Sequence, residues 1–181
     1  MTHYDPHKHH RRSIRLKGWD YRAPGYYFVT ICSQGRRLLF SNDDYRAIAA
    51  NSLIRIPAQK HAQHVALDEW IVMPDHIHAI IIFTDYPAKV DFSEPNTGFR
   101  NALAGSLGVV VGRYKSGVTT RINALRRTKG AKAWQRGYYE RIIRDERQLQ
   151  ATRAYIRANP ARWADDHDDL DILLSQMTLH N

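Results

Sequence analysis

The chain has 181 residues, and its 27 lysine and arginine residues outnumber 18 aspartate and glutamate residues, giving a net charge of +9. This length suits one domain, and the single cysteine excludes an intrachain disulfide. No apolar run approaches the ~20 residues that a membrane span requires, and the polar N-terminus lacks the apolar centre of a signal peptide. We therefore expect a cytoplasmic protein of one domain.

The basic charge is concentrated in one part of the sequence. Residues 111–163 hold 14 lysine or arginine residues against three acidic residues, whereas residues 164–181 hold five aspartates and no lysine or arginine. A block this basic is typical of a protein that binds a polyanion, most simply the phosphate backbone of a nucleic acid. A solvated basic surface is the alternative interpretation.

The first elements are a polar arm, a strand and a helix. Residues 1–24 are basic and histidine-rich, and we interpret them as an N-terminal arm. The run 26–33 predicts a buried strand because it is rich in β-branched and aromatic residues. Residues 42–56 predict a helix that Asn42 caps and Pro57 ends.

The middle of the chain predicts a hairpin, a long helix and another strand. The runs 64–73 and 76–84 are apolar and are separated by a Pro-Asp turn signal, which favours a β-hairpin. Residues 99–125 predict a helix that its glycines weaken and break into two pieces near Gly117. Residues 138–144 predict a fourth strand.

A last helix is predicted over residues 146–159, where Asp145 caps the start and Pro160 ends the helix. The order β-α-β-β-α-β-α predicts an α+β fold of the ferredoxin-like or RRM-like class. In this βαββαβ sandwich, helices cover one face of an antiparallel sheet, and a C-terminal helix is added. We expect one catalytic domain over residues 25–163 and an acidic tail over residues 164–181.

His76 and His78 form a candidate metal site. Residues i and i+2 of a strand point to the same face, so two imidazoles would lie side by side while Ile77 points into the core. Two such rings can chelate one divalent ion. A histidine pair satisfied by hydrogen bonds is the alternative, but the pair begins a very apolar strand, where polar side chains are otherwise out of place.

Tyr155 and Asn159 are a second candidate, because their i,i+4 spacing puts them on one face of the last helix. A phenol can attack a phosphodiester and retain the bond as a phosphotyrosine. A divalent ion on the histidines would polarise the phosphate, and the amide oxygen of Asn159 could be a third ligand. Such ligands admit Mg or Mn, and also Zn. A tyrosine that only anchors the helix is the alternative.

Several segments, in the same order, are similar to a known family. The run WIVMPDHIHAIIIF (70–83) resembles the HUH motif strand of insertion-sequence tyrosine transposases. Further segments resemble the REP-associated tyrosine transposases: GYYFVTICSQGR (25–36), GRYKSGVTTRIN (112–123), WQRGYYERIIRDE (134–146) and YIRANPARW (155–163). The resemblance spans residues 11–163 and does not include the acidic tail.

The resemblance implies an activity and the residues that carry it out. His76 and His78 correspond to the ligands of the catalytic divalent ion, Tyr155 to the nucleophile, and Asn159 to the polar residue that completes the metal site. The family cuts single-stranded DNA beside REP-type hairpins, leaves a 5′-phosphotyrosine and a free 3′-OH, and then rejoins strands. Some relatives are dimers and others act as monomers, so a monomer or a homodimer is expected at the bacterial nucleoid.

Candidate DNA-binding residues lie in the basic block. Contacts to the phosphate backbone are expected from Arg113, Lys115, Arg121, Arg126, Arg127 and Arg136. Tyr114 and Trp134 could stack on unpaired bases, with core packing as the alternative for Trp134.

The sequence also allows other interpretations. Tyr138 and Tyr139 are competing tyrosines, although at least one of these rings should be buried in its strand. A non-catalytic nucleic-acid-binding module of the same fold is the main alternative function. A metal-dependent hydrolase of small substrates is a further alternative, against which the basic block speaks.

Overall fold

The structure, a computed structural model, describes residues 16, 18–84 and 103–165. Its regular elements are β1 (Gly25–Cys32), α1 (Asp43–Ile54), β2 (Val65–Val72), β3 (His76–Phe83), α2 (Leu107–Leu125), β4 (Tyr139–Ile143) and α3 (Glu146–Asp165). Three short 3-10 helices lie at Gln34–Arg36, Leu39–Ser41 and Lys60–Ala62. Among the described residues, no helix combines the length and the apolarity that crossing a bilayer would need.

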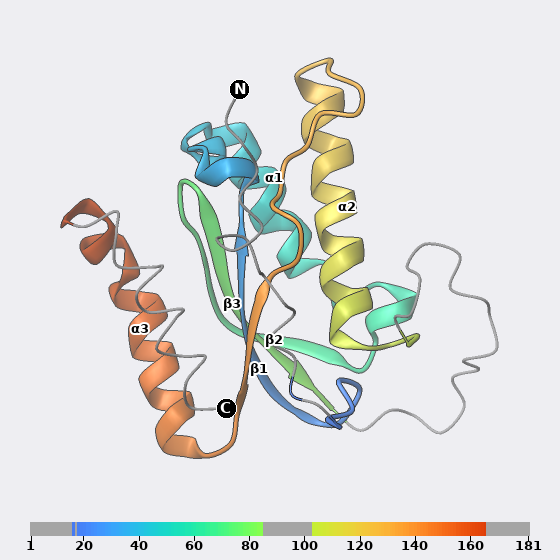
Figure 1. Cartoon of the computed structure of the whole chain (residues 1–181), viewed down its shortest axis with the longest axis vertical. Coiled ribbons are helices and arrows are strands. Elements are labelled where there is room, and N and C mark those ends of the chain that lie inside the picture. Colours follow the sequence, from blue (N-terminus) through green and yellow to red (C-terminus); the bar gives the residue numbers. More distant parts are fainter. Residues whose placement is uncertain (1–15, 17, 85–102, 166–181) are drawn as a thin grey trace, which may run out of the picture.

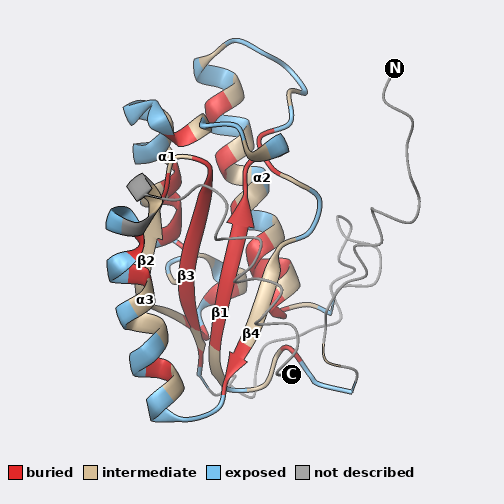
Figure 2. Ribbon diagram, turned by 60° about the vertical axis from the view of Figure 1, so that its left-hand side comes forward, coloured by how far each residue is buried: buried red, intermediate tan, exposed pale blue. Residues whose placement is uncertain are grey.

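The strands form one antiparallel sheet in the order β2-β3-β1-β4 (Figure 1). Helices α1 and α2 cover one face of this sheet, and α3 covers the opposite face (Figures 1 and 2). The central strands β1 and β3 are the most deeply buried, as Figure 2 shows. This architecture confirms the predicted α+β fold class and the antiparallel sheet.

Alternation along β1 and β3 divides the apolar side chains between two layers. Val29 and Ile77 belong to the large core under α1 and α2, whereas Phe28 and Ile80 belong to a smaller cluster under α3. The register pairs Thr30 with His78 and Cys32 with His76 on the α3 side. The polar residues of β1 and β3 therefore lie on the face that α3 covers.

The prediction of a break in α2 near Gly117 is wrong, because α2 continues without interruption from Leu107 to Leu125. A glycine inside a helix costs about 1 kcal/mol relative to alanine. The buried residues Tyr114, Val118 and Ile122 follow one another at i,i+4 spacing across this glycine. Their packing against the core outweighs the local preference. The part of the predicted helix before residue 103 lies outside the described residues.

The prediction that Pro160 ends the last helix is also wrong, because α3 continues to Asp165. Proline removes one helical hydrogen bond and crowds the preceding turn, so a continued helix needs compensation. A hydrogen bond between the side chains of Trp163 and Asp75 supplies such a contact beyond the proline. Of the predicted acidic tail, residues 166–181 lie outside the described residues.

Part of the predicted N-terminal arm is integrated into the domain. Tyr21 is buried in the main core, and its carbonyl accepts a hydrogen bond from the backbone N–H of Leu107 at 3.0 Å. The indole of Trp19 donates to the hydroxyl of Tyr27 at 3.1 Å. Trp19 and Tyr21 of the predicted arm therefore contact the domain, while residues 1–15 and 17 lie outside the described part.

Candidate active site

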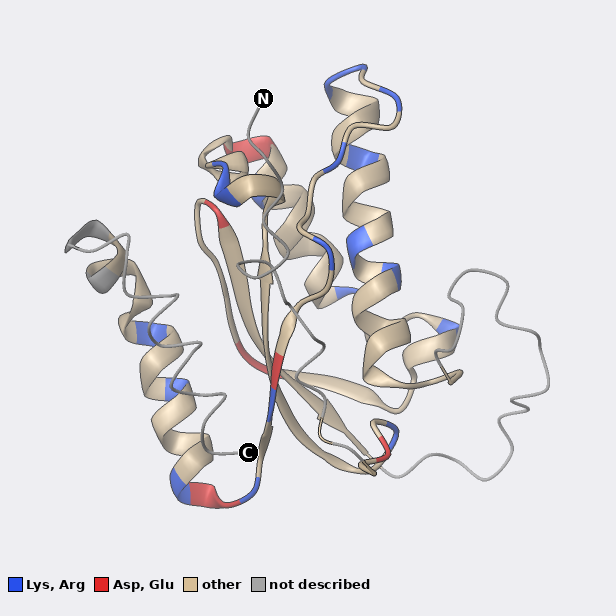
Figure 3. Cartoon of the chain, viewed as in Figure 1, with Lys and Arg blue, Asp and Glu red and all other residues tan. Residues whose placement is uncertain are grey.

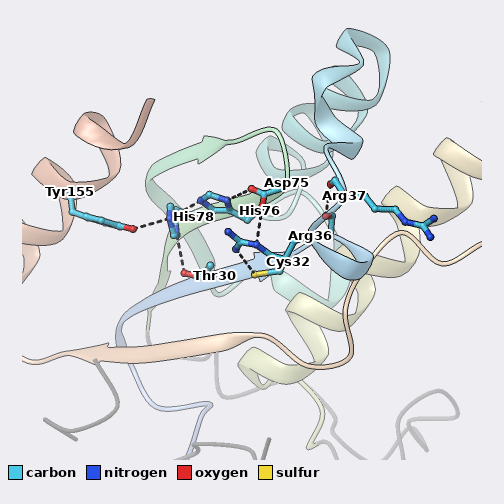
Figure 4. A network of polar contacts seen from close by, with 9 residues as sticks. Thr30, Cys32, Arg36, Arg37, Asp75, His76, His78 and Tyr155 are labelled. Carbon is cyan, nitrogen blue, oxygen red and sulfur yellow. Dashed lines mark hydrogen bonds and ion pairs between the residues drawn. The ribbon is translucent and has the colours of Figure 1, made fainter. Parts of the chain in front are cut away.

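The two histidines of β3 converge on one point. Both rings are buried, and both lie on the α3 face because they are two residues apart in a strand. Their Nε2 atoms are 3.1 Å apart (Figure 4). Ile77, between them, is buried in the opposite layer, as the sequence predicts.

Each imidazole is oriented by an oxygen atom at its other nitrogen. Nδ1 of His76 donates to Oδ1 of Asp75 at 2.6 Å, since an ionised carboxylate can only accept. Nδ1 of His78 lies 2.8 Å from Oγ1 of Thr30, its cross-strand neighbour on β1. In the tautomer that carries the proton of each ring on Nδ1, both Nε2 lone pairs would be available to a cation between them.

Burial and neighbouring charges favour the neutral form of His78 and the ionised form of Asp75. Burial, together with the nearby charges of His76 and Arg36, lowers the pKa of His78 well below its ordinary value. Although burial raises the pKa of Asp75, the hydrogen bond from His76 and the charges of His76 and Arg36 bring it below its usual range. A neutral His78 and an ionised Asp75 are the states that a divalent ion requires.

The hydroxyl of Tyr155 lies at the same point. It is 3.3 Å from Nε2 of His78, and Figure 4 shows it directed at the imidazole pair. The ring of Phe28 stacks on His78 at a centroid distance of 5.2 Å and meets Tyr155 edge-on at 6.1 Å. Residues of β1, β3 and α3 thus form one site within a single chain.

Helix α3 is positioned by apolar packing and by two ion pairs. Leu149 and Ile156 pack into the small cluster on this face of the sheet. One turn of α3 apart, Arg153 binds Asp68 at 2.7 Å and Arg157 binds Glu69 at 2.8 Å. Both carboxylates lie where the register of β2 against β3 is interrupted, so the irregular part of β2 anchors the helix.

Comparisons with known proteins bear on the family and the fold of the chain. No family model matches the sequence. An uncharacterised protein of Haemophilus influenzae is 35% identical over 175 residues, which cover 91% of this chain and 96% of that protein, and the chain belongs to its family. A solved structure of a REP-associated tyrosine transposase bound to a REP hairpin matches 82% of this chain and 73% of its own, with a TM-score of 0.53 at 17% identity. The chain has the REP-associated tyrosine transposase fold.

Asn159, expected to complete the metal site of this transposase fold, lies one turn after Tyr155 on α3. This residue is only 6% exposed. Among those residues, no group of three or more histidine, cysteine, aspartate or glutamate side chains could hold a metal. The donors that fit an ion are therefore the two imidazoles, and the amide of Asn159 as a third ligand stays a prediction.

Two of the predicted DNA contacts are core residues of the transposase fold. Tyr114 is 3% exposed, and its hydroxyl donates to the carbonyl of Ala49. Trp134 is 7% exposed, packs on Phe40 and donates to the carbonyl of Lys115. Burial excludes base stacking by either ring in this structure, so core packing, the alternative considered for Trp134, is what the structure shows.

The basic side chains predicted to contact DNA differ in whether they already form hydrogen bonds within the protein. The ammonium group of Lys115 donates to the carbonyls of Gln135 and Gly137 at 2.8 and 2.6 Å, and burial lowers the pKa of Lys115 to about 8. Lys115 therefore ties α2 to the segment before β4. Arg121 and Arg126 donate to neighbouring side chains, Ser52 and Asn123 respectively. Arg126 is half-buried, whereas the other four arginines are exposed: Arg113, Arg121, Arg127 and Arg136.

These basic residues follow α2 and the connection from α2 to β4 (Figure 3). Because α2 covers the face opposite α3, they do not gather around the imidazole pair. The polar groups that do surround it were missed in the sequence: Thr30, Arg36 and Asp75. Asp75 could have been noticed as a carboxylate directly before a histidine ligand, whereas Thr30 requires the strand register.

Proposed function

We propose that the protein is a divalent-metal-dependent single-strand DNA endonuclease and strand transferase that cuts beside REP-type hairpins. The observation that carries the proposal is the 3.3 Å distance between the hydroxyl of Tyr155 and Nε2 of His78. A phenol, an imidazole pair and a nearly buried amide on one face of the sheet are the groups that such a reaction needs.

In this proposal, His76 and His78 hold the ion and Asn159 supplies a further ligand. Imidazole nitrogen and amide oxygen with open coordination positions suit Mg or Mn. When bound, the ion would polarise the scissile phosphate and offset the charge that develops on it. Asp75 and Thr30 act through the histidines, since their oxygen atoms fix the direction of both rings.

Tyr155 is the proposed nucleophile. Its oxygen forms a bond to phosphorus while the bond from phosphorus to the 3′-oxygen breaks. The phenolic proton is lost to solvent, and the leaving 3′-oxygen gains a proton, so that the products are a 5′-phosphotyrosine and a free 3′-OH. Rejoining is the reverse reaction with a 3′-OH as the attacking group, and it returns the phenol.

Two further observations support DNA as the substrate. Exposed arginines occur along α2 and the connection that follows it (Figure 3), and such positions suit contacts to a phosphate backbone. The solved relative of the same fold is bound to a REP hairpin. The site is assembled within one chain, so this proposal needs no tyrosine from a partner subunit.

The proposal is tested with hairpin-forming single strands taken from the repeats of the host genome. The protein is incubated with labelled strands and MnCl2 or MgCl2, and covalent adducts are separated on a denaturing gel. We expect an adduct that EDTA prevents and that Tyr155→Phe abolishes while the variant still binds the DNA. A wild-type protein that binds these hairpins but forms no adduct would favour the non-catalytic binding module.

A further inference from the structure

Arg36 lies in a turn that is unusual for an arginine. The 3-10 helix Gln34–Arg36 directly follows β1, and Gly35 and Arg36 have φ angles of 63° and 56°. Two successive left-handed residues suit glycine or asparagine, whereas most other side chains are disfavoured there by about 1 kcal/mol or more. The surrounding hydrogen bonds hold this turn, including that from the hydroxyl of Ser33 to the carbonyl of Arg37 at 2.6 Å.

The turn places the guanidinium group beside the imidazole pair. Nε of Arg36 binds Oδ2 of Asp75 at 2.9 Å, and Nη1 donates to the sulfur of Cys32 at 3.5 Å. The other oxygen of the same carboxylate binds His76. In Figure 4 the guanidinium lies next to the ring of His76, while the side chain of the neighbouring Arg37 points away.

Arg36 keeps unused hydrogen-bonding capacity at this point. Its side chain is 28% exposed, and its contacts with Asp75 and Cys32 are made through Nε and Nη1. Arg153 and Arg157, which also lie near this face, are held by Asp68 and Glu69. Arg36 is therefore a fixed cation, open to solvent, next to the histidines and on the side of the sheet that carries Tyr155.

We propose that Arg36 is a further catalytic residue, which donates a hydrogen bond to a non-bridging oxygen of the scissile phosphate. This inference rests on the proposed function. Negative charge develops on these oxygens as the phenol adds to phosphorus, and a preorganised guanidinium stabilises it without rearrangement. The strained turn and the Asp75 contact restrict the side chain before the substrate arrives.

A purely positioning role for Arg36 makes a different prediction. If the arginine only holds Asp75, its loss changes the orientation of His76 and slows every substrate equally. If it contacts the phosphate, its loss matters only for substrates that carry the negative charge. The charge on the substrate therefore separates the two roles.

The probe is the p-nitrophenyl ester of thymidine 5′-phosphate, which requires no knowledge of the DNA sequence. Attack by Tyr155 on its phosphorus releases p-nitrophenolate in place of the 3′-oxygen and leaves thymidine linked to the tyrosine through its 5′-phosphate. The neutral comparison is the same ester with a methyl group in place of one non-bridging oxygen. Release of p-nitrophenolate is measured at equal enzyme and MnCl2 concentrations.

The test variant is Arg36→Asn, because asparagine tolerates the left-handed backbone. We expect its burst rate with the charged ester to fall by about 100-fold. With the neutral ester we expect a change below about threefold. Arg37→Asn is the matched control and should leave both rates unchanged, and Arg36→Lys should lie between wild type and Arg36→Asn with the charged ester.

Equal losses of Arg36→Asn on both esters, or no loss on either, would overturn the assignment and leave the proposed function standing. Circular dichroism and Mn2+ titration confirm that the variant folds and holds the ion; if it does not, Arg36→Lys carries the comparison between esters. A wild-type protein that forms no adduct with either ester would count against the proposed function itself and would remove this inference with it.

Discussion

The hydroxyl of Tyr155 lies 3.3 Å from Nε2 of His78, although 77 positions separate the two residues in the chain. Phe28 of β1 makes this approach possible, because its ring contacts both side chains. Phe28, Ile80 and Ile156 are buried in one cluster. Their packing holds α3 against the sheet at the position where Tyr155 meets His78. The apolar contacts thus set the distance between the phenol and the imidazoles.

Divalent metal should stabilise the folded protein through the two histidines. Binding to the native state alone adds about 2.7 kcal/mol to the free energy of unfolding at 100 times the dissociation constant. We therefore expect MnCl2 to raise the Tm of the wild type. The double variant His76→Gln/His78→Gln should show no such rise. A shift of equal size in both proteins would place the metal elsewhere.

Thr30→Val should weaken metal binding while the fold is retained. The substitution conserves shape but removes the oxygen 2.8 Å from Nδ1 of His78. Loss of such an outer contact typically reduces metal affinity by about 10- to 100-fold. Titration with Mn2+, followed by electron paramagnetic resonance, measures the affinity. Thr30→Ser keeps the hydroxyl and should restore most of it, and a Thr30→Val protein with wild-type affinity would contradict the assigned role.

The ion pairs of α3 should matter for the reaction more than for global stability. Asp68→Lys removes the ion pair that joins Arg153 to β2, so we expect hydrogen exchange in α3 to accelerate and adduct formation to slow several-fold. The double variant Asp68→Lys/Arg153→Glu restores opposite charges and should recover part of the rate. If the single variant has wild-type kinetics and exchange, apolar packing alone positions the helix.

His61 should make the protein less stable in mild acid. Burial, together with the charges of Arg113 and His64, lowers the pKa of His61 from 6.5 to about 4. As pH falls below about 6.5 the unfolded chain takes up a proton that the folded protein does not, so stability is present above that pH and is lost toward the folded pKa.

After allowance for partial exposure, this residue accounts for roughly 1 kcal/mol between pH 7 and pH 5. Urea denaturation at the two pH values measures the difference. His61→Gln should show a smaller acid-induced loss than the wild type. An unchanged loss would mean that His61 titrates normally in the folded protein.

The strands and the fold class were predictable because their signals are local. Runs of β-branched and aromatic residues mark all four strands, and Asn42 caps α1 as expected, with its side chain accepting from the backbone of Tyr45. The two wrong helix predictions share one cause. At Gly117 and Pro160 the local preference is outweighed by tertiary contacts that the sequence does not display.

The site was only partly predictable for a related reason. The i,i+2 spacing of the histidines and the resemblance around Tyr155 point to residues that the structure brings together. Arg36 depends on a left-handed turn, and Thr30 on the register between β1 and β3, so neither role can be derived from spacing. Likewise, the basic residues beside Tyr114 in the sequence predict that Tyr114 lies at the surface. In the structure, Tyr114 belongs to the apolar stripe of α2 and its ring is buried.

The identity of the residue that carries the cut strand tests the central claim most directly. The protein is incubated with the thymidine ester and MnCl2, digested with trypsin and analysed by tandem mass spectrometry. The account predicts a thymidine 5′-phosphate adduct on the peptide of residues 154–157, at Tyr155, that is absent when EDTA is added. An adduct at Tyr138 or Tyr139, or one at Tyr155 that forms equally well in His76→Gln/His78→Gln, would contradict it.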